Sequence, residues 1–460
     1  MDKRRRIILG LVLLSYFIVA IDGSIVITGL SRISTDLNLS HVAFSWVQNA
    51  YVLAFGGFML MGGSMSDTFG RKRMFNISLV LFGIGSLGSG IAQSAAFIIV
   101  SRFIQGAGSA IMAPCSLALI MDYFEGKERV KAVAWYGSIS GLGLCIGLIL
   151  GGAITDYISW RAGFLVNIPI ICVMITLSIK NLDGKDITKA RFDIIGTILS
   201  VAGIFCLVYA IDGADNMTIW VIAGIVLLAV FVSCERNNTI AIMPLRLFNN
   251  ADRRNAYISR MLLIGAMMGF NFFISEFMQE TFRYTPLMTG IGFFPMNVAT
   301  FIGAMKVPSA VNRYGNYRVL ITGLILLTIG FSDMLMLKGD SSYLSGVALP
   351  MLFIGSGVGL SMSPLTNLGI SDVDNNDAGV ASGLVNVAHQ IGGALGLSAM
   401  VSASNNITDM AERFHSAMYL AIACIIIALC LSLSTRYKYG KHKLGLYLKH
   451  SNNKNKPTNA

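Results

Sequence analysis

The chain alternates between long apolar runs and short polar connections, and this pattern predicts membrane-spanning helices. Each run holds about 20 residues, which is enough for a helix to cross roughly 30 Å of hydrocarbon. Lipid offers a backbone no hydrogen-bond partners, so such runs must be helical. We predict an all-α polytopic membrane protein with fourteen spans, near residues 7–30, 43–65, 74–92, 97–121, 132–154, 162–179, 194–211, 218–234, 256–279, 288–310, 319–337, 343–368, 379–403 and 417–435.

The positions of Lys and Arg predict the orientation of these spans. If the N-terminus is cytoplasmic, the connections on that side hold 28 Lys and Arg residues, with Arg260 counted at the edge of its span, and the opposite loops hold five. Positive residues are retained on the cytoplasmic side of membrane proteins, so this asymmetry predicts that both termini are cytoplasmic. One connection on that side, ISDVDNNDAG, is acidic, but acidic residues carry little weight in this rule.

The composition excludes several classes of protein. The 460 residues are 54% hydrophobic and 13% charged, and the mean hydropathy is +0.67, which no soluble domain of this size requires. The formal net charge of +11 lies mainly in short connections, so it indicates membrane orientation and no nucleic-acid partner. The seven cysteines lie in or at the ends of apolar runs, which is not the pattern of a disulfide framework. The basic start is followed by a long apolar run without a clear cleavage site, so we predict an uncleaved first span.

Reactive motifs are missing from the sequence. It contains no P-loop, zincin helix, nucleophile elbow or Cys/His cluster, so we expect no direct use of ATP, no metal and no other cofactor. No connection is long enough to form a soluble catalytic or signalling domain. We therefore expect neither an enzyme nor a receptor.

A weak internal repeat divides the chain. The second and tenth spans are each followed by a similar stretch, GGSMSDTFGRKR (62–73) and VPSAVNRYGNYR (307–318). We predict a six-helix half at 1–180, a linker with an inserted two-helix hairpin at 181–255, a second six-helix half at 256–437 and a basic cytoplasmic tail at 438–460. Repeated halves with a site between them at mid-membrane are typical of transporters.

Several stretches also carry a resemblance to a known family. The loop GGSMSDTFGRKR resembles a motif of the major facilitator superfamily, SRFIQGAGSAIMAP (101–114) resembles its fourth-helix motif, and GLGLCIGLILGG (141–152) resembles the antiporter motif of its fifth helix. Four further stretches are similar to the fourteen-span drug/proton antiporter branch: AIDGSIVITGL, WRAGFLVNIPI, MPLRLFNN and AGVASGLVNVAHQIGGALG. The likeness covers nearly the whole chain.

This resemblance implies the major facilitator fold, with fourteen helices arranged as 6+2+6. It implies a proton-coupled antiporter that exports amphipathic cationic or zwitterionic drugs by alternating access, driven by the proton gradient. It further implies multidrug efflux and antibiotic resistance by a monomer in the lipid bilayer of the bacterial cytoplasmic membrane. A proton-coupled transporter of one metabolite, lipid precursor or tetracycline-like compound is the alternative.

The fifth-helix stretch departs from the family pattern at one position. Leu148 follows Gly147 where the family has proline, whereas the other motif glycines, Gly143, Gly151 and Gly152, are present. Glycines allow two membrane helices to approach closely, so we retain the antiporter assignment.

Asp22 is the only charged residue in the first apolar run. An ionised carboxylate at that depth costs roughly 2.5–3.5 kcal/mol. Asp22 is therefore either a structural carboxylate held by a cation or backbone groups, or a proton-coupling site. Arg102 is the expected partner, because the two residues lie about 12 and 8 Å from the same membrane edge at 1.5 Å per residue, and the resemblance implies that their helices are neighbours. In the alternative, Arg102 extends to the surface.

Glu276 is the second acid inside a predicted span. It is either a headgroup-level carboxylate near Arg283 or a second proton-coupling site. Asp212 and Asp333 lie at span ends, so we expect both to be solvated.

Polar, aromatic and methionine side chains in the later spans are candidates for the substrate cavity, since flexible methionine surfaces accept varied ligands. His389 is either a proton relay or a packing residue. The cavity candidates are Asn271, Phe272, Gln279, Met296, Asn297, Asn386 and Gln390.

The turn after the second span contains residues suited to a conformational latch. Gly63 and Gly70 permit close packing and a tight turn, and Asp67 and Arg71 can pair between helices. These residues either form salt bridges that break between transport states or serve only as a topology signal.

Overall fold

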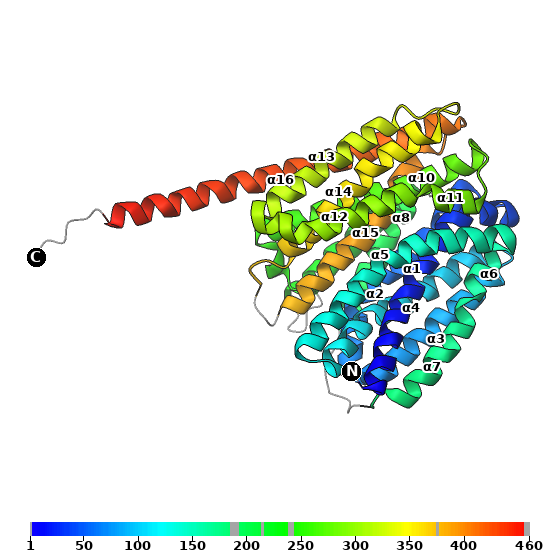
Figure 1. Ribbon diagram of the computed structural model, residues 1–460, viewed down its shortest axis with the longest axis horizontal. Helices are drawn as coiled ribbons and strands as arrows, with labels where there is room; N and C mark the ends of the chain where they lie inside the picture. Colours follow the sequence, from blue (N-terminus) through cyan, green and yellow to red (C-terminus); the bar gives the residue numbers. More distant parts are fainter. Residues whose placement is uncertain (1, 185–192, 213–215, 238–242, 374–376, 455–460) are drawn as a thin grey trace, which may run out of the picture.

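The computed structural model describes residues 2–184, 193–212, 216–237, 243–373 and 377–454. Every regular element in this described part of the chain is helical (Figure 1). The elements are α1 (Lys3–Leu37), α2 (His41–Phe69), α3 (Arg71–Gly90), α4 (Ala95–Tyr123), α5 (Gly126–Tyr157), α6 (Trp160–Leu165), α7 (Asn167–Asn181), α8 (Ile194–Ile211), α9 (Met217–Asn237), η1 (Leu245–Phe248), α10 (Ala251–Glu280), α11 (Pro286–Gly292), α12 (Phe294–Tyr314), α13 (Asn316–Met334), η2 (Leu344–Ala348), α14 (Leu349–Gly369), α15 (Ala378–Ser404) and α16 (Met410–Lys454).

The helices coincide with the predicted apolar runs. Eleven of the runs correspond to one helix each, to within three residues at the end of α3 and α13, and the other three are divided between the consecutive pairs α6–α7, α11–α12 and η2–α14. The last helix is longer than predicted, because α16 continues past the expected span end at residue 435 to Lys454. The all-helical class is therefore confirmed for the described residues.

Helix length and apolar composition identify fewer candidate membrane spans than the fourteen predicted from the sequence. Among the described residues, eleven segments are long and apolar enough to cross a membrane. They do not include α2 and α3, and α5 contributes only a shorter apolar segment, Ile146–Tyr157. Most of the first half of α2 is buried by other helices, so this helix can carry more Ser, Gly and Asn than a helix facing lipid.

Two ion pairs define the ends of the bundle. At the start of α1, Arg4 pairs with Asp183 beyond the end of α7 at 2.5 Å. At the other end of α1, Asp36 pairs with Arg161 of α6 at 2.8 Å. We call these the amino end and the opposite end of the bundle.

The helices form two packed groups with an interface between them. In the first group α2 and α3 pack on α4, and α1 packs on α5; in the second, α10 packs on α15 and α16, and α12 and α13 pack on α14. The groups meet where α2 contacts α15, α5 contacts α11, and α1 contacts α10. Two large hydrophobic clusters fill the groups, and the cluster centred on α10 also takes in Phe44 and Val47 of α2.

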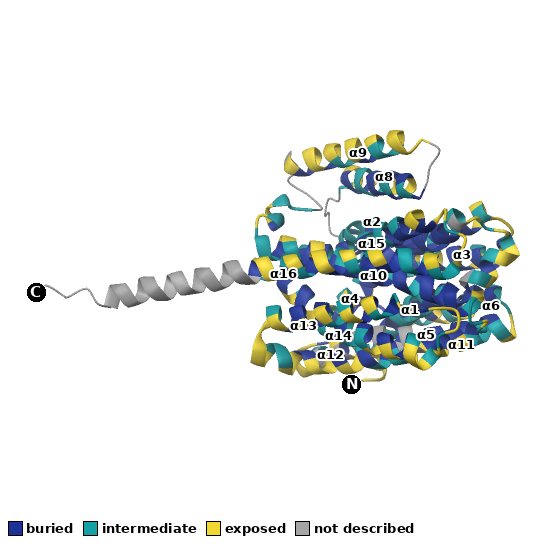
Figure 2. Ribbon diagram, turned by 90° about the horizontal axis from the view of Figure 1, so that it is seen from above, coloured by how far each residue is buried: buried dark blue, intermediate teal, exposed yellow. Residues whose placement is uncertain are grey.

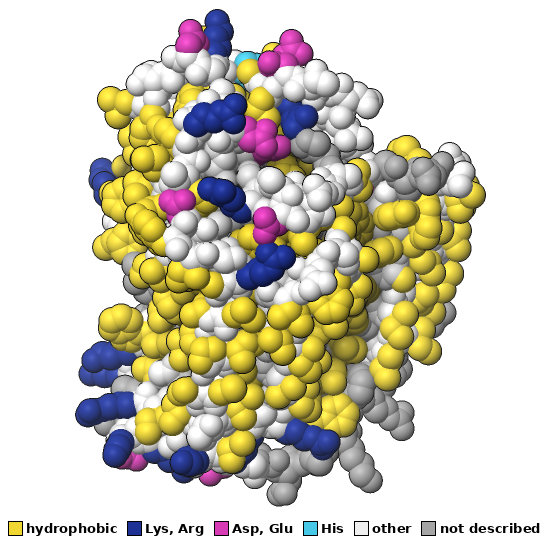
Figure 3. All heavy atoms as spheres, turned by 90° about the vertical axis from the view of Figure 1, so that its right-hand side faces the viewer, with side chains coloured by type: hydrophobic (Ala, Val, Ile, Leu, Met, Phe, Trp, Pro, Cys, Tyr) yellow, Lys and Arg dark blue, Asp and Glu magenta, His cyan; other side chains and the backbone are white. Residues whose placement is uncertain are grey.

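The helices α8 and α9 lie outside this pair of groups. They pack on each other, and α8 also contacts α2 and α15 (Figure 2). Only 11% of the most apolar stretch of α9 is buried inside the protein, so this helix presents an apolar surface outwards. On the side of the molecule seen in Figure 3, hydrophobic side chains cover a broad area, with Lys and Arg along the lower edge and a mixture of Lys, Arg, Asp and Glu over the upper part. An apolar surface with a basic border is what a membrane protein requires.

Candidate functional site

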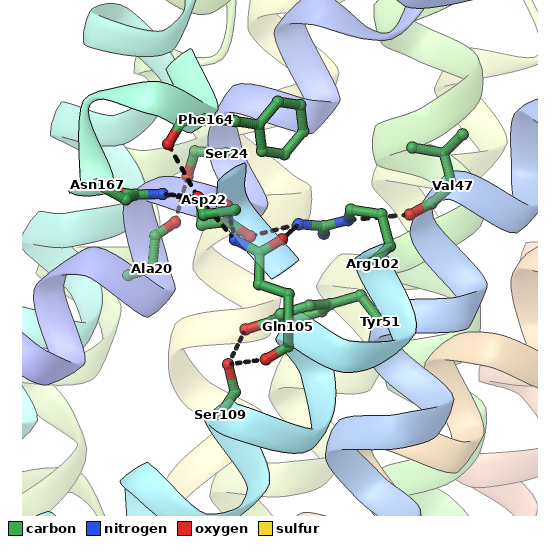
Figure 4. Close-up of polar contacts among 11 residues, drawn as sticks. Ala20, Asp22, Ser24, Val47, Tyr51, Arg102, Gln105, Ser109, Phe164 and Asn167 are labelled. Atoms are coloured by element: carbon green, nitrogen blue, oxygen red, sulfur yellow. Dashed lines mark hydrogen bonds and ion pairs between the residues drawn. The ribbon is translucent and has the colours of Figure 1, made fainter. Parts of the chain in front are cut away.

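Asp22 and Arg102 form an ion pair inside the first group of helices (Figure 4). Both side chains are fully buried, and Nη1 of Arg102 lies 2.5 Å from Oδ2 of Asp22. The second carboxylate oxygen accepts a hydrogen bond from Nε2 of Gln105 at 2.7 Å and a longer one from Nδ2 of Asn167 at 3.5 Å. The structure therefore contains the pairing expected from the depths of the two residues, and surface extension of Arg102 is wrong.

Arg102 has further partners besides the carboxylate. Its Nε donates to the backbone oxygen of Val47 at 3.1 Å, and its Nη1 also donates to Oε1 of Gln105 at 2.6 Å. The guanidinium lies 4.3 Å from the ring centroid of Tyr51 and 5.6 Å from that of Phe164. The arginine is thus held by two other helices, and only Nη2 is buried without a hydrogen bond. These contacts fix the cation in place independently of Asp22.

Polar side chains that sequence reasoning did not select complete this network. Ser86 of α3 accepts from Nδ2 of Asn167 at 2.9 Å and from Nε2 of Gln105 at 3.3 Å, and donates to the backbone oxygen of Phe164 at 2.8 Å. Tyr51 and Ser109 hydrogen-bond at 2.8 Å. Each of these residues is a polar side chain within an apolar run, and that signal alone could have singled them out.

Glu276 forms an ion pair with Arg413 of α16. It is 4% exposed, and its Oε1 lies 3.3 Å from Nη1 of Arg413 at the start of α16. Arg413 is held in turn by two hydrogen bonds to the backbone oxygen of Ile407. The carboxylate is therefore buried and paired with a residue that the sequence did not single out, and a proton-coupling role for Glu276 stays a prediction.

The cavity candidates are not gathered in one place. Asn271 and Phe272 line a small cavity between the two groups, together with Gln48 of α2. Gln279 donates to the backbone oxygen of Thr28, near the opposite end of the bundle. These three candidates therefore lie at the interface, with Gln279 about 12 Å along α10 from Asn271.

The other four candidates have different surroundings. Gln390 packs on α2 at Gly56. The backbone oxygen of Met296 lies against Gly355 of α14, and the neighbouring Asn297 is 5% exposed within the second group. Asn386 donates to the backbone oxygen of Ser382 in its own helix. A substrate role for all seven thus stays a prediction.

The motif glycines of α5 lie against the helix that holds Asp22. A Cβ atom at Gly147 would lie 3.0 Å from the Cα of Ile21, and one at Gly151 would lie 2.7 Å from the Cα of Ile25. Gly143 similarly faces Ala20. Gly152 instead meets the backbone of Pro286 in α11, across the interface. The motif therefore sets how closely α5 approaches both α1 and the second group.

Arg71 connects the predicted latch to α4. It pairs with Asp67 at 3.3 Å and with Asp122, and Nη1 donates to the backbone oxygen of Ala118 at 2.7 Å. Gly70 has a φ of +87°, which favours glycine, and lets α3 begin directly after α2. Gly63 lies near the ring of Pro114. These contacts all lie within the first group of helices, and Asp122 was not selected from the sequence.

Asp212 is buried, contrary to the sequence-based expectation. It is 2% exposed and lies beside Asn49 of α2 and Ser398 of α15, which hydrogen-bond to each other at 2.8 Å. The end of α8 therefore reaches the line where the two groups meet. Asp333, for which solvation was also expected, is partly buried.

Two packed groups of apolar helices with buried charges near their interface define a polytopic membrane transporter. The sequence profile described as "Major Facilitator Superfamily" matches residues 12–397, and the chain belongs to this family. It is accordingly a multi-pass protein of the bacterial cytoplasmic membrane.

Curated relatives and solved structures agree with this assignment. The chain is 31% identical to the puromycin resistance protein pur8 of Streptomyces alboniger (88% of this chain, 83% of the relative) and 31% identical to the cephamycin export protein CmcT of Amycolatopsis lactamdurans (90% and 89%). It is 30% identical to the multidrug resistance protein Stp of Mycobacterium tuberculosis (85% and 74%). The fold is similar to that of a POT family peptide transporter, with a TM-score of 0.70 and 13% identity over 95% of this chain and 97% of that one.

Proposed function

We propose that the protein is a proton-coupled antiporter that exports amphipathic drugs, cationic or zwitterionic, from the cytoplasm. The observation that carries this proposal is the fully buried pair of Asp22 and Arg102. An ionised carboxylate enclosed in apolar helices is costly. Gain or loss of one proton at Asp22 therefore changes the free energy of the helix arrangement around it. Similarity to proteins named for antibiotic resistance and export supports drugs as the substrates.

In this proposal the two groups of helices are the moving halves of an alternating-access transporter. All fourteen predicted runs would span the membrane as 6+2+6, with halves at 1–180 and 256–437, the hairpin inserted in the linker at 181–255, and both termini, including the tail at 438–460, cytoplasmic. The amino end of the bundle would then face the cytoplasm. The protein would act as a monomer without a cofactor.

Coupling between proton and substrate would pass through α1. Asp22 is buried within the first half, so a substrate between the halves would not touch it. Slightly further along the same helix, the backbone oxygens of Ile27 and Thr28 accept hydrogen bonds from Ser275 and Gln279 of α10. Protonation of Asp22 would weaken its pairing with Arg102 and allow α1 to shift. That shift would change the contact of α1 with α10 and hence the closure of the interface.

A proton gradient supplies enough free energy for this exchange. Moving one charge through 100 mV yields roughly 2.3 kcal/mol. That energy corresponds to a substrate concentration ratio of about fifty-fold per proton.

The test uses the purified full chain in liposomes with an imposed pH gradient and an internal pH dye. A panel of lipophilic cations, zwitterions, neutral compounds and anions is added to the parent, to Asp22→Asn and to a matched control, Asp333→Asn. We expect several unrelated cations or zwitterions to move protons with the parent and with Asp333→Asn, but not with Asp22→Asn. Full proton-coupled activity in Asp22→Asn would reject Asp22 as the coupling residue, and Glu276→Gln would be tested next. Proton movement with only one class of compound would favour the narrow-specificity alternative.

A further inference from the structure

Arg260 is a buried cation on α10, a helix of the second group. It was counted with the polar connections in the sequence, but it lies within α10 and is only 9% exposed. Its Nη1 donates to the backbone oxygen of Met362 at 3.0 Å and lies 3.5 Å from Oγ1 of Thr366, both on α14. Its Nε is buried and makes no hydrogen bond. Within the described part of the chain, no carboxylate forms an ion pair with it.

Other arginines within the described helices are better compensated. The buried Arg102 and the partly buried Arg413 each pair with a buried carboxylate. Arg253 donates to three backbone oxygens, those of Leu247, Ser371 and Asp372. A buried cation without a counter-charge is costly, and among the described residues the partners of Arg260 are neutral, so an anion beside it would be stabilising.

The position of Arg260 on α10 places it on the side that faces the first group. It lies about three helical turns before Asn271, so the two residues occupy the same face of the helix. Asn271 lines the small cavity between the groups, together with Ile27 of α1. Tyr16 lies the same number of turns before Ile27 on α1, and it interacts electrostatically with Arg260. Arg260 therefore lies at the interface, roughly 16 Å nearer the amino end than Asn271.

Residues around Arg260 are suited to an anion and not to a cation. His389 of α15 and Tyr16 of α1 are both close enough to interact electrostatically with Arg260. A guanidinium presents paired N–H donors that match the two oxygens of a carboxylate. The two hydrogen bonds from the Arg260 side chain to α14 use only Nη1.

We infer that Arg260, flanked by Tyr16 and His389, is an anion-binding subsite that takes the carboxylate of an amphipathic zwitterionic substrate. This inference rests on the proposed export function and narrows its substrate class. A zwitterion with a free acid is then a better substrate than the same compound with that acid esterified.

A matched pair of fluorescent probes tests this subsite. Rhodamine 110 carries a free carboxylate, and rhodamine 123 is its methyl ester with the same xanthene body. Binding of each probe to the full chain in detergent is measured by fluorescence polarisation, for the parent, Arg260→Gln, Arg260→Lys and the control Arg254→Gln. Arg254 is an exposed arginine of the same helix.

We expect the parent to bind the acid more tightly than the ester. Arg260→Gln should weaken binding of rhodamine 110 by tenfold or more, as loss of a charge-assisted hydrogen bond predicts, and change rhodamine 123 less than twofold. Arg260→Lys should recover part of the loss, and Arg254→Gln should change neither probe. The subsite would be overturned if the parent binds the two probes with equal affinity. It would also be overturned if Arg260→Lys weakens the binding of both probes equally while its melting temperature is unchanged. Failure of the antiport proposal is separate, since it would appear as binding without proton movement in liposomes.

Discussion

Nη1 of Arg102 lies 2.5 Å from Oδ2 of Asp22 although the two residues are 80 positions apart, and neither side chain has any exposed surface. The two partners do not depend on each other equally. Arg102 also contacts a backbone oxygen, a side-chain amide and two aromatic rings. Among the described residues, the further hydrogen bonds of Asp22 come from Gln105 at 2.7 Å and Asn167 at 3.5 Å. Their substitutions should therefore differ in cost.

Arg102→Gln should destabilise the protein more than Asp22→Asn. Each change leaves one buried charge without its partner, which costs about 3–5 kcal/mol. Arg102→Gln additionally removes the hydrogen bond to Val47 and the contacts with the rings of Tyr51 and Phe164, whereas Asp22→Asn leaves those contacts in place. Thermal unfolding of both variants in the same detergent measures the difference, and equal melting temperatures would contradict the asymmetry.

Glycine-to-alanine changes at two helix positions should have opposite effects. A Cβ at Gly147 would lie 2.8 Å from Ser24 and 3.0 Å from the backbone of Ile21, whereas a Cβ at Gly23 would meet nothing within 4 Å. Gly147→Ala should therefore cost about 1–3 kcal/mol through overpacking of α5 on α1. Gly23→Ala should be neutral or stabilising by up to about 1 kcal/mol, because alanine favours a helix. Melting temperatures compare the pair directly, and a similar loss in both would show that helix approach is not the cause.

Asp122 should contribute more to the proposed latch than Asp67 does. Both pair with Arg71, but the side chain of Asp122 is 20% exposed and that of Asp67 is 63% exposed. An exposed pair is weakened by solvent and salt, so Asp67→Asn should cost less than about 1 kcal/mol. Asp122→Asn should reduce both stability and transport rate more strongly. Transport assays at low and high salt check the order, since only the effect of Asp67→Asn should disappear at high salt.

Asp36 should add acid-sensitive stability at the opposite end of the bundle. Hydrogen bonds from the Trp160 indole and the Arg161 guanidinium lower the pKa of Asp36 from its ordinary value of 3.8. Because the folded-state pKa is below the unfolded one, this stabilisation is fully present above the unfolded pKa. It is lost as the pH falls through the folded pKa. The carboxylate is half exposed, so the effect is about 0.5–1 kcal/mol at neutral pH.

The corresponding measurement compares the parent with Asp36→Asn. The parent should melt at a higher temperature at neutral pH, and the gap should close below the folded-state pKa. A gap that persists undiminished in strong acid would assign the stabilisation to packing of Trp160 and Arg161 instead.

The helices were predictable from the sequence because an apolar run in lipid has one satisfactory conformation. The pairing of Asp22 with Arg102 was predictable because depth along two neighbouring helices limits which buried charges can meet. The partner of Glu276 was not, since Arg413 comes from a helix 137 residues away and only the packing of α10 on α16 brings it close. Asp212 was misassigned for a similar reason. A residue just past the end of a helix is normally solvated, but α8 packs on α2 and α15, and Asp212 is covered where they meet.

The place of Asp212 has a mechanical consequence for the pair α8 and α9. Its carboxylate is buried at the end of α8, a helix that packs on α2 of one group and on α15 of the other. If those two helices rotate against each other, α8 cannot follow both, and the charge must part from one of them. The separation would expose the Asp212 carboxylate to hydrocarbon, which is costly. The helices α8 and α9 would therefore oppose the rotation until Asp212 is protonated or gains a new polar partner. In the proposed transport cycle, α8 and α9 would then slow the rotation of the two groups and limit the rate of transport.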